Sequence, residues 1–170
     1  STLIVTGPQS RLLLKKLTSA DLEKPWLSVQ KAKIGNYAVS LARVSFAGEL
    51  GWEIHTENKN IRLIYKKIIA YGAKPFGMFA LNSLRIEKGY KTWKGDLSTD
   101  YSVLESGLDR FVRLDKRENF PGKSAIFVEK QRGVKKKAVT LSLDLNDFDA
   151  PYMSTLWKNN QIVGEVTSGA

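Results

Sequence analysis

The chain has 170 residues, 42% of them hydrophobic, and a formal net charge of +10 from 27 Lys and Arg against 17 Asp and Glu. It contains no cysteine and one histidine, His55, which excludes disulfide bonds, thiolate zinc sites, a cysteine nucleophile and histidine-rich metal sites. No apolar run approaches the roughly 20 residues of a membrane span. Residues 1–7 lack the charged segment followed by an apolar segment that is typical of a signal peptide. These properties indicate a soluble, basic, globular chain that buries a core.

The first third of the chain predicts a strand, a short helix and a two-stranded ribbon. A β-branched run at residues 1–6 ends at a Gly-Pro pair, and the leucines that follow favour a helix over 8–17. Period-two alternation over 36–56 predicts two strands joined by a glycine-containing loop. In the second strand, Glu53 and His55 share the face opposite to Trp52 and Ile54.

Further elements follow to the end of the chain. Apolar stripes predict one helix over 61–71 that stops at Gly72, and another from about 77 to 88 that stops at Gly89. Beyond them the pattern predicts a helical segment at 103–108, a helix at 123–128, and strands at 111–114, 138–143 and 162–167. The last strands suit a small antiparallel domain, and an end directly after a strand suggests an excerpt from a longer protein.

Four stretches carry a pattern more specific than composition. They are GELGWEI at 48–54, GMFALNSLRIEKGY at 77–90, LESGL at 104–108, and LDK at 114–116 with FPGK at 120–123. Their order and spacing resemble the glycine-cleavage T-protein (aminomethyltransferase) superfamily. The second stretch, followed by Trp93 and Asp96, is most similar to the folate-binding region of dimethylglycine and sarcosine dehydrogenases.

The resemblance implies an α+β fold that is an internal piece of a larger architecture. Residues 1–116 would be the C-terminal portion of the folate-binding domain, 117–137 a connecting helix and basic linker, and 138–170 the truncated start of an antiparallel C-terminal β-barrel. The family's N-terminal segment, with its catalytic aspartate, would precede Ser1, and a flavin domain that binds FAD would lie earlier still in the dehydrogenases. We therefore expect no catalytic residue in this chain, and any enzymatic activity belongs to the parent protein.

The resemblance also implies a function for the parent. The parent would bind tetrahydrofolate and form 5,10-methylenetetrahydrofolate from an amine-derived methylene group. Its expected partners are folate, a small amine or an aminomethyl-carrier substrate, and the missing N-terminal domain, with no nucleic acid, membrane or metal. The expected location is the cytoplasm, or the mitochondrial matrix in a eukaryote.

Four residues match the family's folate site, and each also has an ordinary structural interpretation. Glu53 would accept two parallel hydrogen bonds from the N–H and amino group of a reduced pterin, or else face solvent. Arg85 would reach the folate, or else pair with Glu87. Phe46 stands where the family usually has tyrosine and would stack on the pterin, while Trp93 would line the pocket or the core. The family gives His55 no catalytic part, and a lone strand histidine is more often a polar surface group.

Two other interpretations remain open. A folate-binding module of this superfamily can serve another role, such as support of iron–sulfur assembly or demethylation of a sulfonium compound. The basic runs, such as 135–137, invite a nucleic-acid-binding module instead. No recognition-helix or aromatic-ribbon signature accompanies these charges, so a solvated surface is favoured.

Overall fold

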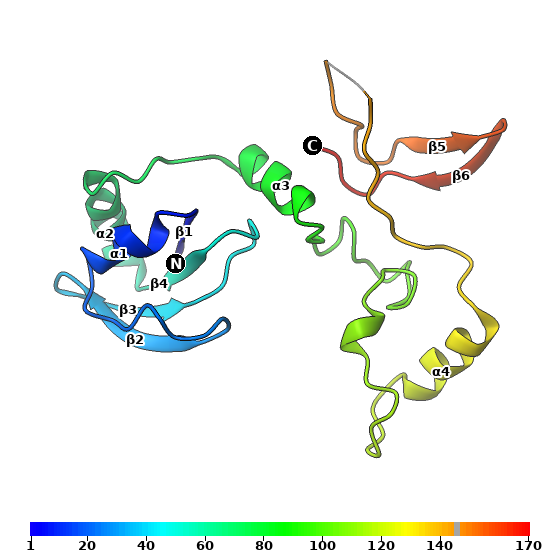
Figure 1. The fold of residues 1–170 in the computed structure, drawn as a ribbon, viewed down its shortest axis with the longest axis horizontal. Helices are drawn as coiled ribbons and strands as arrows, with labels where there is room; N and C mark the ends of the chain where they lie inside the picture. The colour runs from blue at the N-terminus through cyan, green and yellow to red at the C-terminus, as the bar shows by residue number, and fades with distance from the viewer. Residues whose placement is uncertain (145–146) are drawn as a thin grey trace. The chain divides into compact units, whose positions relative to one another are not determined.

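The computed structural model describes residues 1–144 and 147–170 of the chain. These residues divide into two compact units, Ser1–Tyr90 and Lys91–Ala170, whose elements are labelled in Figure 1. The first unit holds a four-stranded sheet with helices, and the second holds a helix and a two-stranded sheet. Helices and antiparallel strands are mixed along the chain, so the expected α+β class is confirmed.

The sheet of the first unit consists of β1 (Thr2–Thr6), β2 (Val29–Ile34), β3 (Tyr37–Ala42) and β4 (Gly51–His55). Its order is β1-β4-β3-β2, and every neighbouring pair is antiparallel. Strand β4 is therefore central, with Glu53 opposite Ile4 on one side and Ala42 on the other. Because side chains alternate along a strand, this register decides which residues share a face with Glu53.

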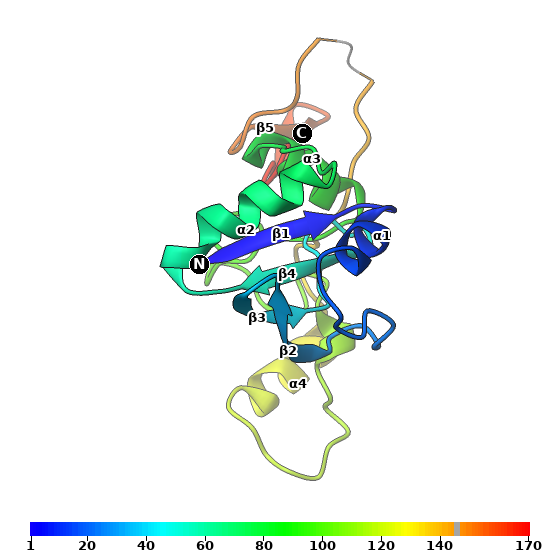
Figure 2. The same cartoon turned by 90° about the vertical axis from the view of Figure 1, so that its left-hand side faces the viewer.

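One face of this sheet builds the core. Helices α1 (Ser10–Lys15) and α2 (Asn58–Ala70) both contribute to it (Figure 2). The core consists of ten buried apolar residues: Val5, Leu14, Leu22, Ile34, Val39, Leu41, Trp52, Ile54, Ile64 and Ile68. The residues that alternate with the strand members of this core point to the opposite face, and Glu53 and His55 are among them.

Helix α3 (Met78–Glu87) is the last element of the first unit, and its C-terminal end contacts the loop at 43–50. Lys88, which caps the helix, pairs with Glu49 of that loop at 3.1 Å. Gly48 has a φ of +72°, and a Cβ on it would lie 2.2 Å from Cγ of Lys88. Glycine is thus required there both by the backbone conformation and by the close approach of the lysine stem.

The second unit has little buried surface. It contains a 3₁₀ helix, η1 (Asp109–Phe111), helix α4 (Lys123–Arg132), and the antiparallel pair β5 (Thr155–Lys158) and β6 (Gln161–Glu165) (Figure 1). Ser106 is the only buried residue among those that the structure describes in this unit. Hydrogen bonds therefore carry more of its structure than apolar burial does.

The predicted elements of the first unit are largely confirmed, whereas several in the second unit are wrong. Residues 111–114 form the end of η1 and a turn instead of a strand. Residues 138–143 form no strand, and the Ala138 amide donates to the carbonyl oxygen of Glu105, which lies in a turn. Residues 103–108 form a turn and not a helix. Strands β2 and β5 were not predicted, and the start of a barrel stays a prediction.

Within residues 1–144 and 147–170, no helix is long and apolar enough to span a membrane. The same described residues contain no group of three or more His, Asp or Glu side chains arranged to hold a metal ion.

Candidate functional site

Glu53 lies in the middle of β4, on the sheet face that the core leaves uncovered. Its neighbours Trp52 and Ile54 are 1% and 0% exposed, so the alternation of the strand turns the carboxylate to the other side. The Glu53 side chain is 31% exposed. One carboxylate oxygen, Oε2, lies 2.9 Å from Nε2 of His55. The other, Oε1, has no hydrogen-bond partner in the described part of the chain, which leaves it able to accept from a ligand.

His55 follows Glu53 on the same face of β4 and connects it to strand β1. Its Nδ1 lies 2.9 Å from Oγ1 of Thr2, the residue paired with it in the β1–β4 register. A row of three side chains, Thr2, His55 and Glu53, therefore crosses the two strands. The sequence shows that His55 and Glu53 share a face, but only the strand register reveals Thr2 as the third member.

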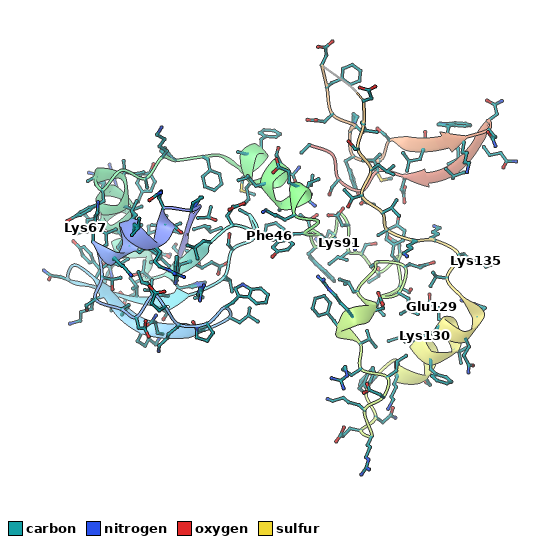
Figure 3. The ribbon with its side chains drawn as sticks, viewed as in Figure 1. Phe46, Lys67, Lys91, Glu129, Lys130 and Lys135 are labelled. Atoms are coloured by element: carbon teal, nitrogen blue, oxygen red, sulfur yellow. The ribbon has the colours of Figure 1, made fainter. Side chains whose placement is uncertain are left out.

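Phe46 lies in the loop before β4, beside the C-terminal end of α3 (Figure 3). Its ring centroid is 6.3 Å from that of Tyr90, with the rings tilted by 35°. This is a typical distance for an aromatic pair that avoids face-to-face stacking. Phe46 remains 36% exposed, so part of its ring is accessible from solvent.

Arg85 is buried at that same end of α3, with 3% of its surface exposed. Its Nε and Nη2 donate to Oδ1 of Asn82 at 2.9 and 2.6 Å, and its Nη1 donates to the Tyr90 carbonyl oxygen at 3.0 Å. The Tyr90 amide in turn donates to the Arg85 carbonyl oxygen. These bonds give the guanidinium a role in ending the helix. A folate contact by Arg85 stays a prediction.

Two of the four residues singled out by the sequence are thus brought together. Phe46 and Arg85 both contact Tyr90. Glu53 makes no hydrogen bond or ion pair with Arg85, because its one such partner among the described residues is His55.

Trp93 belongs to the second unit, where it is 73% exposed and does not form part of a core. It lies in a tight loop that Asp96 holds together. Oδ2 of Asp96 accepts from the Thr92 amide at 2.8 Å and from the Thr92 hydroxyl at 3.0 Å, while Oδ1 accepts from Thr167 at 2.6 Å. The Trp93 ring is therefore presented on a closed loop, with most of its surface available to a ligand or a partner.

Residues of the first unit supply groups that can contact a ligand. They supply an anionic acceptor with one open oxygen and an accessible aromatic ring. A carboxylate of this kind can accept hydrogen bonds from N–H donors of a ligand.

Comparison with known proteins identifies the family. The model of the GCVT N-terminal domain matches residues 1–116. Dimethylglycine dehydrogenase, mitochondrial, of Rattus norvegicus is 36% identical over 173 residues, which cover 98% of this chain and 20% of the relative. Sarcosine dehydrogenase, mitochondrial, of Mus musculus is 33% identical, with 96% of this chain and 18% of the relative covered. Aminomethyltransferase of Bacillus subtilis (strain 168) is 33% identical, with 98% and 48% covered.

These relatives are all longer than the chain. The chain spans about a fifth of the length of the two dehydrogenases and just under half of the aminomethyltransferase. The match of the relatives over nearly the whole chain confirms the resemblance that the four sequence stretches indicate.

Proposed function

This chain belongs to the GCVT N-terminal domain family, as a module similar to parts of aminomethyltransferases and of dimethylglycine and sarcosine dehydrogenases, and on that premise we propose that it is the tetrahydrofolate-binding part of a one-carbon-transfer protein. Residues 1–116 would form the C-terminal portion of the folate-binding domain. Residues 117–137 would connect it to residues 138–170, the first part of a C-terminal antiparallel barrel. The antiparallel β5–β6 pair supports the assignment of residues 138–170 to an antiparallel barrel.

The reaction belongs to the whole parent protein. We propose that the parent forms 5,10-methylenetetrahydrofolate from a methylene group that a small amine or an aminomethyl carrier provides. Tetrahydrofolate, when bound, supplies the nitrogen that accepts this one-carbon unit. The contribution of this chain is to bind and orient the pterin and to limit its contact with water. A flavin such as FAD would belong to a part of the parent outside these residues, and a mitochondrial or cytoplasmic location would follow that of the parent.

The carboxylate of Glu53 carries the proposal. Its Oε1 is free of hydrogen bonds within the described residues, and the group is neither fully buried nor fully exposed. The N–H and amino group of a reduced pterin lie side by side, at the spacing of the two oxygens of a carboxylate. The hydrogen bond from His55 uses one of the roughly four lone-pair positions of the carboxylate. Two parallel bonds to a pterin therefore remain possible.

The other residues have supporting roles in this proposal. Phe46 would contact the pterin ring through its exposed part, without the hydroxyl that the family's usual tyrosine provides. Arg85 would act chiefly by fixing the end of α3, and with it Tyr90 beside Phe46. Trp93, on its closed loop, would cover a part of the folate.

Substitution of Glu53 by alanine in the full-length protein tests this assignment. The variant should bind tetrahydrofolate more weakly by about 1.5–3 kcal/mol, the scale of hydrogen bonds to a charged group. Titration calorimetry measures the change directly. Glu87→Ala is the matched control, because Glu87 is an exposed carboxylate at the end of α3 and should leave the affinity as it is. Equal affinity of the Glu53 variant and the wild type would remove the assignment.

A further inference from the structure

We propose that His55 is a positioning residue that orients Glu53 for the pterin, and that Thr2 in turn fixes the imidazole. This inference rests on the proposed function, since it gives the Glu53 carboxylate its ligand. The row of contacts from Thr2 through His55 to Glu53 carries it, with both distances at 2.9 Å. His55 would touch neither the reacting atoms nor the pterin.

The donor and acceptor properties of the three side chains determine the direction of each hydrogen bond in the row. An ionised carboxylate can only accept hydrogen bonds, so Nε2 of His55 carries the hydrogen that is donated to Glu53. In the neutral imidazole the other nitrogen, Nδ1, is then an acceptor, and the Thr2 hydroxyl donates to it. Each group therefore selects the tautomer or rotamer of the next one.

Two hydroxyl-bearing residues lie opposite His55 on the neighbouring strands, and in the described part of the chain it is Thr2 whose hydroxyl contacts the ring. His55 pairs with Thr2 on β1 and with Ser40 on β3. The hydroxyl of Ser40 instead accepts a hydrogen bond from Nζ of Lys31 at 2.9 Å. Glu53 and the imidazole are the titratable groups within the row, and Lys31, which contacts Ser40, lies on the same face of the sheet.

The consequence for binding is preorganisation. A glutamate side chain on an open sheet face rotates freely, and a ligand that needs both of its oxygens must first stop that rotation. The bond from His55 holds Oε2 in place before the ligand arrives and leaves Oε1 open. The carboxylate therefore loses its conformational entropy when the protein folds, and ligand binding does not have to order it again.

A double-mutant cycle in the full-length protein tests this inference, with tetrahydrofolate as the probe and calorimetry as the readout. His55→Phe keeps a flat ring without the N–H and should weaken binding by roughly 3- to 10-fold, as expected for one lost hydrogen bond. His55→Gln places an N–H₂ donor near the position of Nε2 and should restore most of the affinity. In the Glu53→Ala background, His55→Phe should cause no further loss, because no carboxylate is left to orient.

A pair of threonine variants tests the second bond of the row. Thr2→Val removes the hydroxyl that donates to Nδ1 and should weaken binding by roughly 2- to 3-fold, since the ring is still held by one partner. Thr56→Val is the control: its hydroxyl donates to the Ala38 carbonyl oxygen at 3.0 Å on the same sheet and does not contact the imidazole. This control should bind tetrahydrofolate as the wild type does.

The outcomes separate the two proposals. If His55→Phe weakens binding equally with and without Glu53, or does not weaken it at all while Glu53→Ala does, the positioning role is wrong and the proposed function stands. If Glu53→Ala binds tetrahydrofolate as well as the wild type, the assignment of Glu53 fails, and the role of His55 fails with it. Absence of any tetrahydrofolate binding by the wild type overturns both.

Discussion

The two units of the chain are stabilised in different ways. The first packs ten apolar side chains into a core, from one sheet face, two helices and the loop residue Leu22, so burial of apolar surface dominates its stability. The second leaves large apolar side chains such as Phe127 and Trp157 at least half exposed, and Ser106 is its only buried residue among those described. The contrast teaches that Glu53 belongs to the unit with the apolar core, which fixes the direction of its side chain.

The largest expected effect comes from truncating Trp52 in the first unit, and Trp157 of the second unit serves as the comparison. Trp52→Ala removes a side chain that is 1% exposed and should lower the free energy of unfolding of the first unit by about 3–5 kcal/mol. Trp157→Ala alters a side chain that is 61% exposed and should change stability by no more than about 0.5 kcal/mol. Urea unfolding followed by circular dichroism compares them. Similar losses from both substitutions would contradict the contrast between the units.

A smaller effect is expected from weakening the hydrogen bonds that Asp96 accepts in the second unit. Asp96→Asn replaces a carboxylate that accepts from the Thr92 amide, the Thr92 hydroxyl and Thr167, and an amide has only one acceptor oxygen. Loss of hydrogen bonds to a charged acceptor costs about 1.5–3 kcal/mol. Exchange of the Thr92 amide hydrogen should therefore accelerate by roughly tenfold or more.

The control for this substitution is Asp109→Asn in the same unit, because Asp109 is exposed at the start of η1. Its exchange rates should match those of the wild type. Unchanged exchange at Thr92 in the Asp96 variant would mean that this unit is held by something other than its hydrogen bonds.

The elements of the first unit were easier to predict from the sequence, because the apolar residues that form its periodic patterns are buried in a core. The alternation of β4 placed Glu53 and His55 on one face, as found. Strand β2 was missed because Lys31 and Lys33 interrupt its hydrophobicity, and only Ile34 is buried. In the second unit, the alternating run at 138–143 pairs with no strand among the residues that the structure describes, and alternation alone does not form a strand.

The candidate site was predictable only in part for a related reason. The motif selected Glu53, Arg85, Phe46 and Trp93, and the structure brings Phe46 and Arg85 to one helix end through Tyr90. The burial of Arg85 against Asn82 and the link from Thr2 to His55 depend on tertiary contacts. No local pattern specifies such contacts, because they join residues from different elements.

The most direct test of the central claim compares tetrahydrofolate with an analogue that lacks the 2-amino group of the pterin, in the wild-type full-length protein and in its Glu53→Ala variant. If Glu53 accepts a hydrogen bond from that amino group, the wild type should bind tetrahydrofolate roughly tenfold or more tightly than the analogue, and the variant should bind both alike. If the variant discriminates between the two compounds as strongly as the wild type does, the amino group is recognised elsewhere, and the account of Glu53 as the pterin anchor is wrong.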